Sequence, residues 1–243
     1  TGYLYYEYVI VDPGPHLDPA HVRSIIAQES PIYYRDGVTR LGVFFEDEHR
    51  QYVSTDELPL AWQMGIVAAE DGSYWSHSGI ALKHLARAMR DNLAAGTVVA
   101  GGSTLSQQTA KNLYYRPDRS LKSKGTELVN ALRPEAHFDK HQILTFYANQ
   151  FHVSGNGRGL GIAARYFFDK TPDALEVQEA AFISGLVKAP SRYDPFLGSA
   201  DRRTGATGKA HDRTRYVLGR MVKEPIENLI PPRREGESQA SYQ

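Results

Sequence analysis

The residues best suited to chemistry stand in the segment 70–79, which reads EDGSYWSHSG. This segment follows an apolar run at 58–69 that predicts a buried helix. The carboxyl groups of Glu70 and Asp71 therefore lie where the helix ends, with His77 and a glycine just beyond. A carboxyl group at the edge of an apolar element has a perturbed pKa, which proton-transfer chemistry requires. The segment predicts an acid–base site, and an ordinary acidic helix end is the alternative.

A second group of polar residues follows the glycine-rich stretch 96–102. Thr104, Gln108 and Lys111 are spaced four and three residues apart, so on a helix they form one polar stripe. The glycines let a ligand approach the backbone, and a helix N-terminus favours an anion. The stripe predicts an anion-binding helix, and a capped surface helix with a solvated face is the alternative.

A third group lies on the helix predicted at 119–137. Lys124 and Glu127 are three residues apart, and surface pairs of this kind contribute roughly 0.5 kcal/mol or less. Taken alone, the pair indicates only a solvated helix face. Glu135 lies nearer the middle of the apolar face, and because a buried carboxylate needs partners we interpret it as structural.

Two further segments place cations beside turns. Residues 154–159 resemble a phosphate-binding glycine loop but lack the Lys-Ser/Thr ending of a P-loop, so a plain turn is the simpler interpretation. Lys188 and Ser191 flank the Ala-Pro pair that ends a predicted helix, where a cation is an ordinary partner of the helix dipole.

The composition excludes several classes of protein. The 243 residues include no cysteine, which rules out disulfides, thiolate nucleophiles and Cys-based zinc sites. Lys plus Arg and Asp plus Glu both number 28, so no global field favours nucleic acid. His77 has no second histidine at metal-ligand spacing, and no Ser-x-x-Lys sequence supports a serine acyl-enzyme.

The elements that must position these residues are mainly helical. Residues 1–30 are expected to be extended and then briefly helical, with a strand pattern at 3–11, and the Asp-Gly pair at 36–37 predicts a hairpin within 32–45. Thr104 and Gln107 have the spacing of a capping box. Periodicity and caps predict helices at 58–69, 80–95, from 104, 119–137, 140–150, 160–168, 175–187 and 211–222.

Two segments have the character of a membrane surface element. Residues 3–11 are rich in the aromatics that favour membrane interfaces, although a simple strand is the preferred interpretation of their pattern. The helix at 80–95 sets Leu85, Met89 and Leu93 against three cations, which suits an interface helix on an anionic membrane. An ordinary amphipathic surface helix is the alternative.

Taken in order, five segments resemble the motifs of bacterial peptidoglycan glycosyltransferases, which comprise the monofunctional transglycosylases and the polymerase half of class A penicillin-binding proteins. The segments are 70–79, 101–112, 123–127, 147–167 and 180–191, within a match that runs over 31–222. One such motif is weak evidence, whereas five in the right order are specific. Residues 1–30 are then a juxtamembrane or linker segment, and 223–243 a tail or linker.

The resemblance implies a mainly α, lysozyme-like fold with a small membrane-facing jaw lobe and a short N-terminal hairpin. It also implies polymerisation of lipid II into glycan strands. The 4-hydroxyl of the acceptor attacks the anomeric carbon of the growing chain, undecaprenyl pyrophosphate leaves, and the configuration inverts. Because the leaving group departs as an anion, cations can replace a strong acid.

The resemblance assigns roles residue by residue. Glu70 is similar to the general base, and Glu127 to a second carboxylate on the donor side. The implied substrate-binding and positioning residues are Asp71, His77, Ser103, Thr104, Gln108, Lys111, Asn112, Lys124, Arg158, Lys188 and Ser191. Ser123 stands where the family usually has Arg, so a phosphate-binding cation is missing there or is replaced by Lys122 or Arg119, and Arg158 in the loop at 154–158 is a further candidate.

Two other functions compete with the polymerase. A lysozyme-like muramidase also uses glutamates, but it needs no pyrophosphate-binding cations. A non-catalytic scaffold that binds lipid II is the other alternative, and Ser123 gives it some support.

The resemblance also implies partners and a location. Lipid II, the growing glycan chain and a membrane surface are the expected partners, with other cell-wall synthesis proteins as candidates and no nucleic acid. The expected location is the outer, periplasmic face of the bacterial cytoplasmic membrane, with an N-terminal anchor that this chain lacks. The family often uses a divalent cation, Mg²⁺ or Mn²⁺, although no metal-ligand cluster is evident in the sequence and no other cofactor is expected.

Overall fold

The structure is a computed structural model that describes residues 2–11, 17, 22, 30–33, 35, 40–44, 49–97, 102–114, 121–155 and 157–232. Within these ranges, the side chains of residues 4, 30–33, 40–44, 84, 89, 92 and 121–128 lie outside the description. The predictions for Lys124 and Glu127 therefore concern side chains that the structure does not describe, although the backbone there is helical.

The fold is mainly α, as predicted. The longer helices are α3 (Leu60–Glu70), α4 (Leu82–Ala95), α5 (Leu105–Leu113), α6 (Leu121–His137), α7 (Lys140–Ala148), α8 (Gly159–Phe168), α9 (Val177–Leu186) and α11 (Ala200–Lys223). Shorter helical turns are η3 (Thr55–Glu57), η4 (Tyr74–Ser76), η5 (Pro172–Ala174), α10 (Pro190–Tyr193) and α12 (Ile226–Leu229). The predicted hairpin is confirmed, since β1 (Ser30–Tyr33) pairs antiparallel with β2 (Arg40–Phe44).

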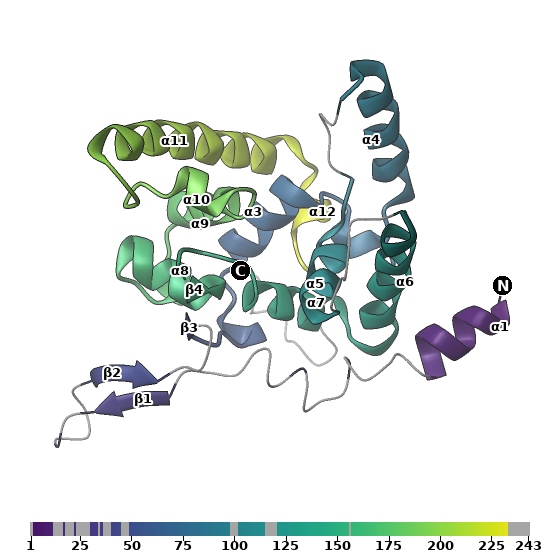
Figure 1. Ribbon diagram of the computed structural model, residues 1–243, viewed down its shortest axis with the longest axis horizontal. Coiled ribbons are helices and arrows are strands. Elements are labelled where there is room, and N and C mark those ends of the chain that lie inside the picture. The colour runs from purple at the N-terminus through teal and green to yellow at the C-terminus, as the bar shows by residue number, and fades with distance from the viewer. Residues whose placement is uncertain are drawn as a thin grey trace.

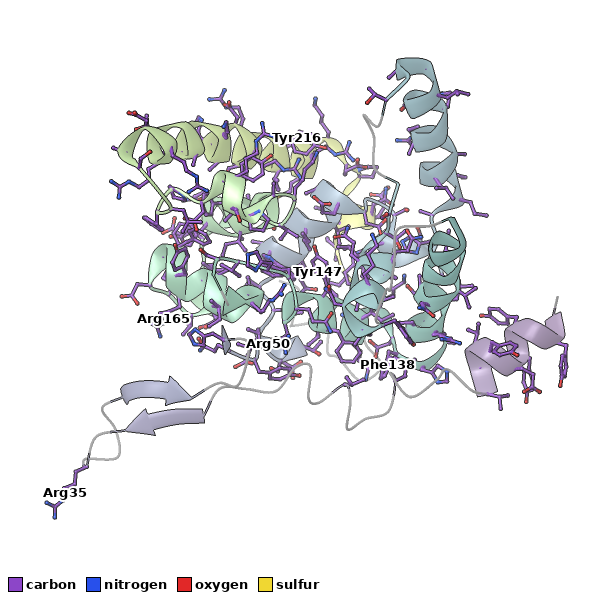
Figure 2. All side chains as sticks on the ribbon, viewed as in Figure 1. Arg35, Arg50, Phe138, Tyr147, Arg165 and Tyr216 are labelled. Atoms are coloured by element: carbon purple, nitrogen blue, oxygen red, sulfur yellow. The ribbon has the colours of Figure 1, made fainter. Side chains whose placement is uncertain are left out.

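Most of the helices form one body, from which α4, the β1–β2 hairpin and the N-terminal helix at residues 2–5 project (Figure 1). Helix α3 lies near the middle, and α11 runs along one edge of the body across α9 and α10. Helix α4 rises away from the body, and the hairpin extends in the opposite direction, with Arg35 at its tip (Figure 2). Glu70, at the end of α3, therefore lies within the body of helices rather than in the projecting hairpin.

Helix α3 is the buried centre of the fold. Its side chains Trp62 and Ile66 are fully buried, and it packs against both α9 and α11. Gly65 makes the close approach to α9 possible, because a Cβ atom there would lie 2.8 Å from Ser184 Oγ. The helix ends at Glu70, so the packing of α3 fixes the backbone that carries the predicted base.

The strand predicted at 3–11 is wrong. Residues 2–11 form α1 (Gly2–Tyr5) followed by the π-helical turn η1 (Tyr6–Val11). The end of this segment docks on α6, where Arg133 Nε donates to the Tyr8 carbonyl at 2.8 Å and His137 Nε2 lies 2.9 Å from the Val9 carbonyl. Val9 is buried there, so tertiary contacts override the β-propensity of the aromatic run.

The glycine loop at 154–159 contains an unpredicted strand. Gly157–Arg158 forms β4, which pairs in parallel with β3 (His49–Arg50) more than a hundred residues earlier in the chain. The pairing fixes the backbone of Arg158, which is also the N-cap of α8. Because the partner is distant in sequence, the local pattern of glycines could indicate only a turn.

The last long helix was predicted only in part. The prediction of 211–222 captured its second half, but α11 begins at Ala200, where Ser199 Oγ accepts from the Arg202 N–H. In the first half of α11, only the small residues Ala206 and Ala210 are buried. The composition of this half is therefore polar, although it is helical.

Part of the chain beyond residue 222 packs on the body of the protein. Helix α12 buries Leu229 completely. The Trp75 Nε1–H donates to the Leu229 carbonyl at 3.3 Å, and His141 Nε2 lies 2.8 Å from the Pro232 carbonyl. Residues 226–232 therefore pack on the loop that follows Glu70, while the domain limits at 30 and 222 stay predictions.

Leu229→Ala is expected to lower the free energy of unfolding by about 2–5 kcal/mol, because it leaves a cavity in a fully buried position. Val222→Ala is the matched control, since Val222 is 86% exposed and its truncation should change stability by less than about 0.5 kcal/mol. Urea unfolding of both variants measures the difference, and equal stabilities would contradict the packing of α12.

Candidate active site

Glu70, the predicted base, lies between two partners that come from distant helices. Its carboxylate Oε1 accepts from Arg213 Nη2 of α11 at 2.9 Å, and the side chains are only 17% and 11% exposed. The Gln108 side chain of α5 also favours the ionised form of the same carboxyl group. The carboxylate is therefore held in a fixed place at the end of α3.

The environment of Glu70 raises its pKa above the usual value. Burial is the main cause, because it disfavours the charged form. Arg213 and Lys188 oppose the shift by their charges, and the Gln108 hydrogen bond opposes it too. A carboxylate with a raised pKa is a stronger proton acceptor than a solvated one, so the arrangement suits a general base.

Gln108 is oriented by a third helix. The Tyr147 hydroxyl of α7 donates to Gln108 Oε1 at 3.3 Å, which leaves the amide N–H groups to face Glu70. Tyr147 lies in the middle of the helical body (Figure 2) and is almost fully buried. The contact with Tyr147 therefore fixes the orientation of the Gln108 side chain, which belongs to the polar stripe predicted on α5.

Arg213 is a site residue that the sequence analysis missed. Its guanidinium also stacks on the Tyr216 ring at 4.6 Å and donates from Nε to the Gly185 carbonyl at 3.3 Å. Arg213 and Arg220 are seven residues apart, with the buried Val217 between them, so they lie on the face of α11 that packs on α3. The spacing of these two arginines around Val217 was the sequence signal that could have identified Arg213, because cations seldom share a helix face with a buried valine.

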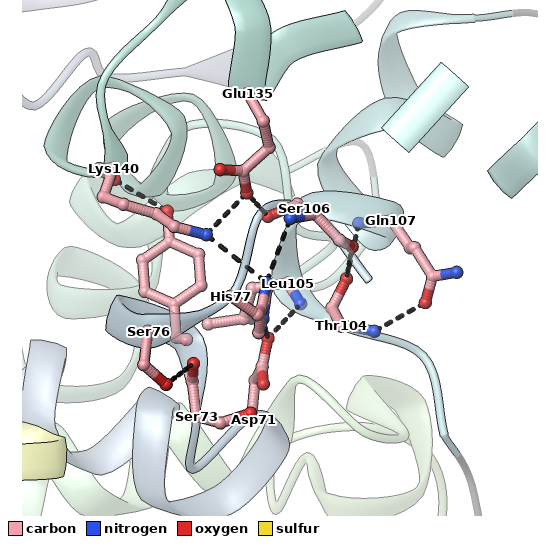
Figure 3. Close-up of polar contacts among 12 residues, drawn as sticks. Asp71, Ser73, Ser76, His77, Thr104, Leu105, Ser106, Gln107, Glu135 and Lys140 are labelled. Carbon is pink, nitrogen blue, oxygen red and sulfur yellow. Dashed lines mark hydrogen bonds and ion pairs between the residues drawn. The ribbon is translucent and has the colours of Figure 1, made fainter. Parts of the chain in front are cut away.

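Asp71 and His77 are brought together (Figure 3), and their side chains are nearly removed from solvent. Asp71 Oδ2 accepts from the Leu105 N–H at 3.0 Å and lies 2.9 Å from His77 Nε2. His77 Nδ1 accepts from the Gly79 N–H, so the imidazole carries its proton on Nε2 and donates it to Asp71. The pair ties the loop after Glu70 to the start of α5.

Thr104 begins α5, and the predicted capping box is confirmed. Its Oγ1 accepts from the Gln107 N–H at 3.1 Å, and the Gln107 side chain accepts from the Thr104 N–H at 2.8 Å. The same hydroxyl donates to the Gly79 carbonyl at 2.6 Å. Since Thr104 is buried and its hydroxyl both donates and accepts within the protein, these contacts position α5, and a role in substrate binding stays a prediction.

The remaining predicted residues have different degrees of exposure. Ser103 is half-buried just before the N-cap of α5, whereas Lys111 and Asn112 are exposed on its last turn. Arg158 is half-buried at the start of α8. Roles in substrate binding for these residues stay predictions, because only their positions are established.

The segment after α9 contributes a cation to the site. Lys188 is exposed and close enough to Glu70 to act on its charge. Ser191 lies in the first turn of α10, exposed, and its carbonyl accepts from Arg202 Nη2 of α11 at 2.7 Å. The structure therefore brings Glu70, Gln108 and Lys188 together, with Ser191 three residues beyond Lys188.

Glu70 and Asp71, the carboxylates nearest the candidate site, do not suit a divalent cation. Within the described ranges, no cluster of three or more His, Asp or Glu side chains could hold a metal ion. Glu70 already pairs with a guanidinium, and Asp71 is almost fully buried and engaged with Leu105 and His77. We therefore derive no step through a metal held by these two residues.

Comparisons with known proteins identify the family. A family model described as transglycosylase matches residues 37–222. The chain is 35% identical over 198 residues to penicillin-binding protein 1A of Neisseria flavescens, which covers 82% of this chain and 24% of that protein. It is 36% identical over 197 residues to the Aquifex aeolicus protein of the same name, which covers 81% of this chain and 26% of that protein.

The chain thus spans about a quarter of the length of these relatives. A crystal structure of penicillin-binding protein 1A from Haemophilus influenzae matches 87% of this chain and 22% of that one, with a TM-score of 0.38 and 18% identity, which is too distant to support an argument. The match of the family model covers most of the folded body and all five motifs recognised in the sequence. The chain therefore belongs to the transglycosylase family.

Proposed function

We propose that this domain polymerises lipid II into glycan strands by inverting glycosyl transfer, with release of undecaprenyl pyrophosphate. The observation that carries the proposal is the environment of the Glu70 carboxylate. This group is buried, its pKa is raised, and Arg213 and Gln108 lie beside it together with the cation of Lys188. Inverting transfer requires a base on the acceptor side and charge stabilisation on the donor side, and this arrangement offers both.

In the proposed reaction, Glu70 takes the proton of the acceptor 4-hydroxyl. The oxygen then forms a bond to the anomeric carbon of the growing chain while the carbon–oxygen bond to pyrophosphate breaks, and the configuration at that carbon inverts. The pyrophosphate leaves as an anion, so Lys188 and the predicted donor-side cations Lys111, Lys124 and Arg158 stabilise it without supplying a proton. Glu70 returns its proton to solvent.

Arg213 has a supporting role in this scheme. Burial alone raises the pKa of Glu70, and the neighbouring guanidinium limits the rise. The guanidinium therefore favours the ionised form of Glu70, which is the state that accepts a proton. Glu127 is proposed as the second carboxylate, on the donor side.

We further propose that the domain works at a membrane surface on the outer face of the bacterial cytoplasmic membrane. None of the described helices is both long and apolar enough to cross a bilayer. Helix α4, however, projects from the body with Leu82 and Leu93 exposed. Four tyrosines at 3–8 are also exposed, and aromatic side chains of this kind favour the interface. These elements support contact with the membrane in which a lipid-linked substrate resides.

The test is to incubate the purified protein with lipid II in detergent or vesicles and to separate the products by size. Polymer that lengthens with time, with release of undecaprenyl pyrophosphate, is the expected result. Release of muropeptides from isolated cell walls would instead indicate a muramidase. Binding of lipid II without either product would indicate a scaffold, and each of these two outcomes would overturn the proposal.

A further inference from the structure

A buried ion pair that the proposed reaction does not use lies next to His77, in the loop that follows Glu70 (Figure 3). Lys140 Nζ at the start of α7 donates to Glu135 Oε1 of α6 at 2.6 Å. The same oxygen accepts from Ser106 Oγ in the first turn of α5. The side chains of Lys140 and Glu135 are only 15% and 9% exposed, so the pair is nearly removed from solvent.

The contacts of this pair close into a ring of side chains. Lys140 Nζ also lies 3.5 Å from His77 Nδ1, and His77 in turn donates to Asp71. Asp71 accepts from the N–H of Leu105, the residue before Ser106. Two adjacent residues of α5, Leu105 and Ser106, therefore complete the ring. The ring connects α5, α6, α7 and the loop after α3.

The two charged residues stand at helix ends that do not favour them. Glu135 lies in the last turn of α6, where the helix dipole favours cations, and Lys140 is the first residue of α7, where it favours anions. Burial lowers the pKa of Lys140, while the charges of Glu135 and Asp71 oppose that shift. Local helix electrostatics therefore do not explain why these charges stand at these helix ends, and we attribute their presence to the tertiary contacts that they make.

The ring connects the two sides of the Glu70 site. Asp71 follows Glu70 directly in the chain, and Ser106 precedes Gln108 by two residues on α5. The bonds that hold Asp71 and Ser106 therefore also fix how far Gln108 stands from the Glu70 carboxylate. A shift of about 1 Å in such a contact can cost roughly 10²-fold in rate.

We propose that Lys140 and Glu135 are positioning residues for Glu70, and that they act by keeping the first turn of α5 in register with the loop that carries Asp71. The inference rests on the proposed function, because it assigns these residues to the base of that reaction. Neither residue touches the substrate in this scheme. Their effect reaches the reaction through Gln108, whose hydrogen bond favours the ionised form of Glu70.

The decisive variant is the double replacement Lys140→Met/Glu135→Gln. Replacing Lys140 alone leaves a buried carboxylate without its cation, which is strongly destabilising, whereas neutralising both partners avoids that penalty. The double variant is therefore expected to be close to wild type in stability. A purely structural pair predicts that activity recovers with stability, and a positioning pair predicts that it does not.

The expected result has a kinetic and a spectroscopic part. The double variant should lower kcat roughly 10²-fold with KM for lipid II changed less than about threefold, since the cation of Lys188 is untouched. Loss of the Gln108 bond should raise the pKa of Glu70 by roughly 0.5–1 unit. The other groups that face Glu70, namely Arg213, Lys188 and Tyr147, remain in place. Titration of ¹³C-labelled glutamate carboxyl groups, assigned with Glu70→Gln, measures this pKa directly.

Lys170→Met/Glu179→Gln is the matched control. Lys170 Nζ lies 2.8 Å from Glu179 Oε2 in a pair that joins the end of α8 to α9, away from the ring. This control should leave kcat and the pKa of Glu70 unchanged. Ser106→Ala is a milder variant that removes one hydrogen bond from Glu135 and should move both readouts in the same direction.

The inference is overturned if the double variant titrates like wild type at Glu70, or if the control pair shifts the pKa of Glu70 equally. The titration does not depend on turnover. If wild-type protein made no polymer, the proposed function would fail, and the carboxyl titration would still decide whether the pair positions Glu70.

Discussion

Replacing Glu70 by Gln is expected to lower the kcat of polymerisation by roughly 10²- to 10⁴-fold, which is the usual contribution of a general base. The amide has nearly the same shape and can still accept from Arg213, so the geometry at the end of α3 should be kept. The amide cannot, however, take the proton of the acceptor hydroxyl. Single-turnover assays with lipid II measure the loss, and near-normal polymer yield would remove Glu70 from the role of base.

The same variant should not lower thermal stability at neutral pH. The pKa of Glu70 is higher in the folded protein than in the unfolded chain, because burial disfavours its charge. The stability linked to this group is therefore fully present below the unfolded pKa and is lost as the pH rises through the folded pKa. The uncharged amide avoids that loss, so calorimetry at pH 7 should give an equal or higher Tm. Glu227→Gln, at an exposed position of α12, is the matched control for removing one carboxylate.

Arg213→Met is expected to move the acid limb of kcat/KM to higher pH by roughly 1–3 units, because a cation 2.9 Å from Glu70 stabilises its ionised form. Glu70 must be ionised to act, so activity falls as the pH drops through its pKa. Raising that pKa costs activity at neutral pH and less at higher pH. A pH series of kcat/KM from 5 to 9 measures the shift.

The pattern of recovery separates this effect from a lost substrate contact. If Arg213 acts through the ionisation of Glu70, raising the pH should restore most of the rate of Arg213→Met. Arg213→Lys should show a smaller shift, since the charge is kept. Arg215→Met is the matched control, because Arg215 is an exposed residue two positions along the same helix. An unshifted acid limb in Arg213→Met would contradict the role given to the guanidinium.

Local signals in the sequence predicted most of the helices. The capping box of Thr104 and Gln107, the apolar run that ends at Glu70 and the Asp-Gly hairpin each depend on residues within about ten positions of one another. Such signals fail where distant contacts decide the structure. The aromatic segment at 3–11 is helical where it docks on Arg133 and His137, and the parallel pairing of β3 with β4 joins segments that no local pattern connects.

The sequence by itself determined the family and the mainly helical fold, and it led to the prediction that Glu70 is the base, because each motif and the apolar run before Glu70 are local stretches of the chain. Only the tertiary structure decided what surrounds that base. Arg213 is 143 residues from Glu70, and it reaches the carboxylate because α11 packs on α3. Lys140 and Glu135 likewise meet Ser106 and His77 only when four chain segments assemble. Charge partners of this kind depend on how helices pack, and helix packing is not encoded in any short stretch of the chain.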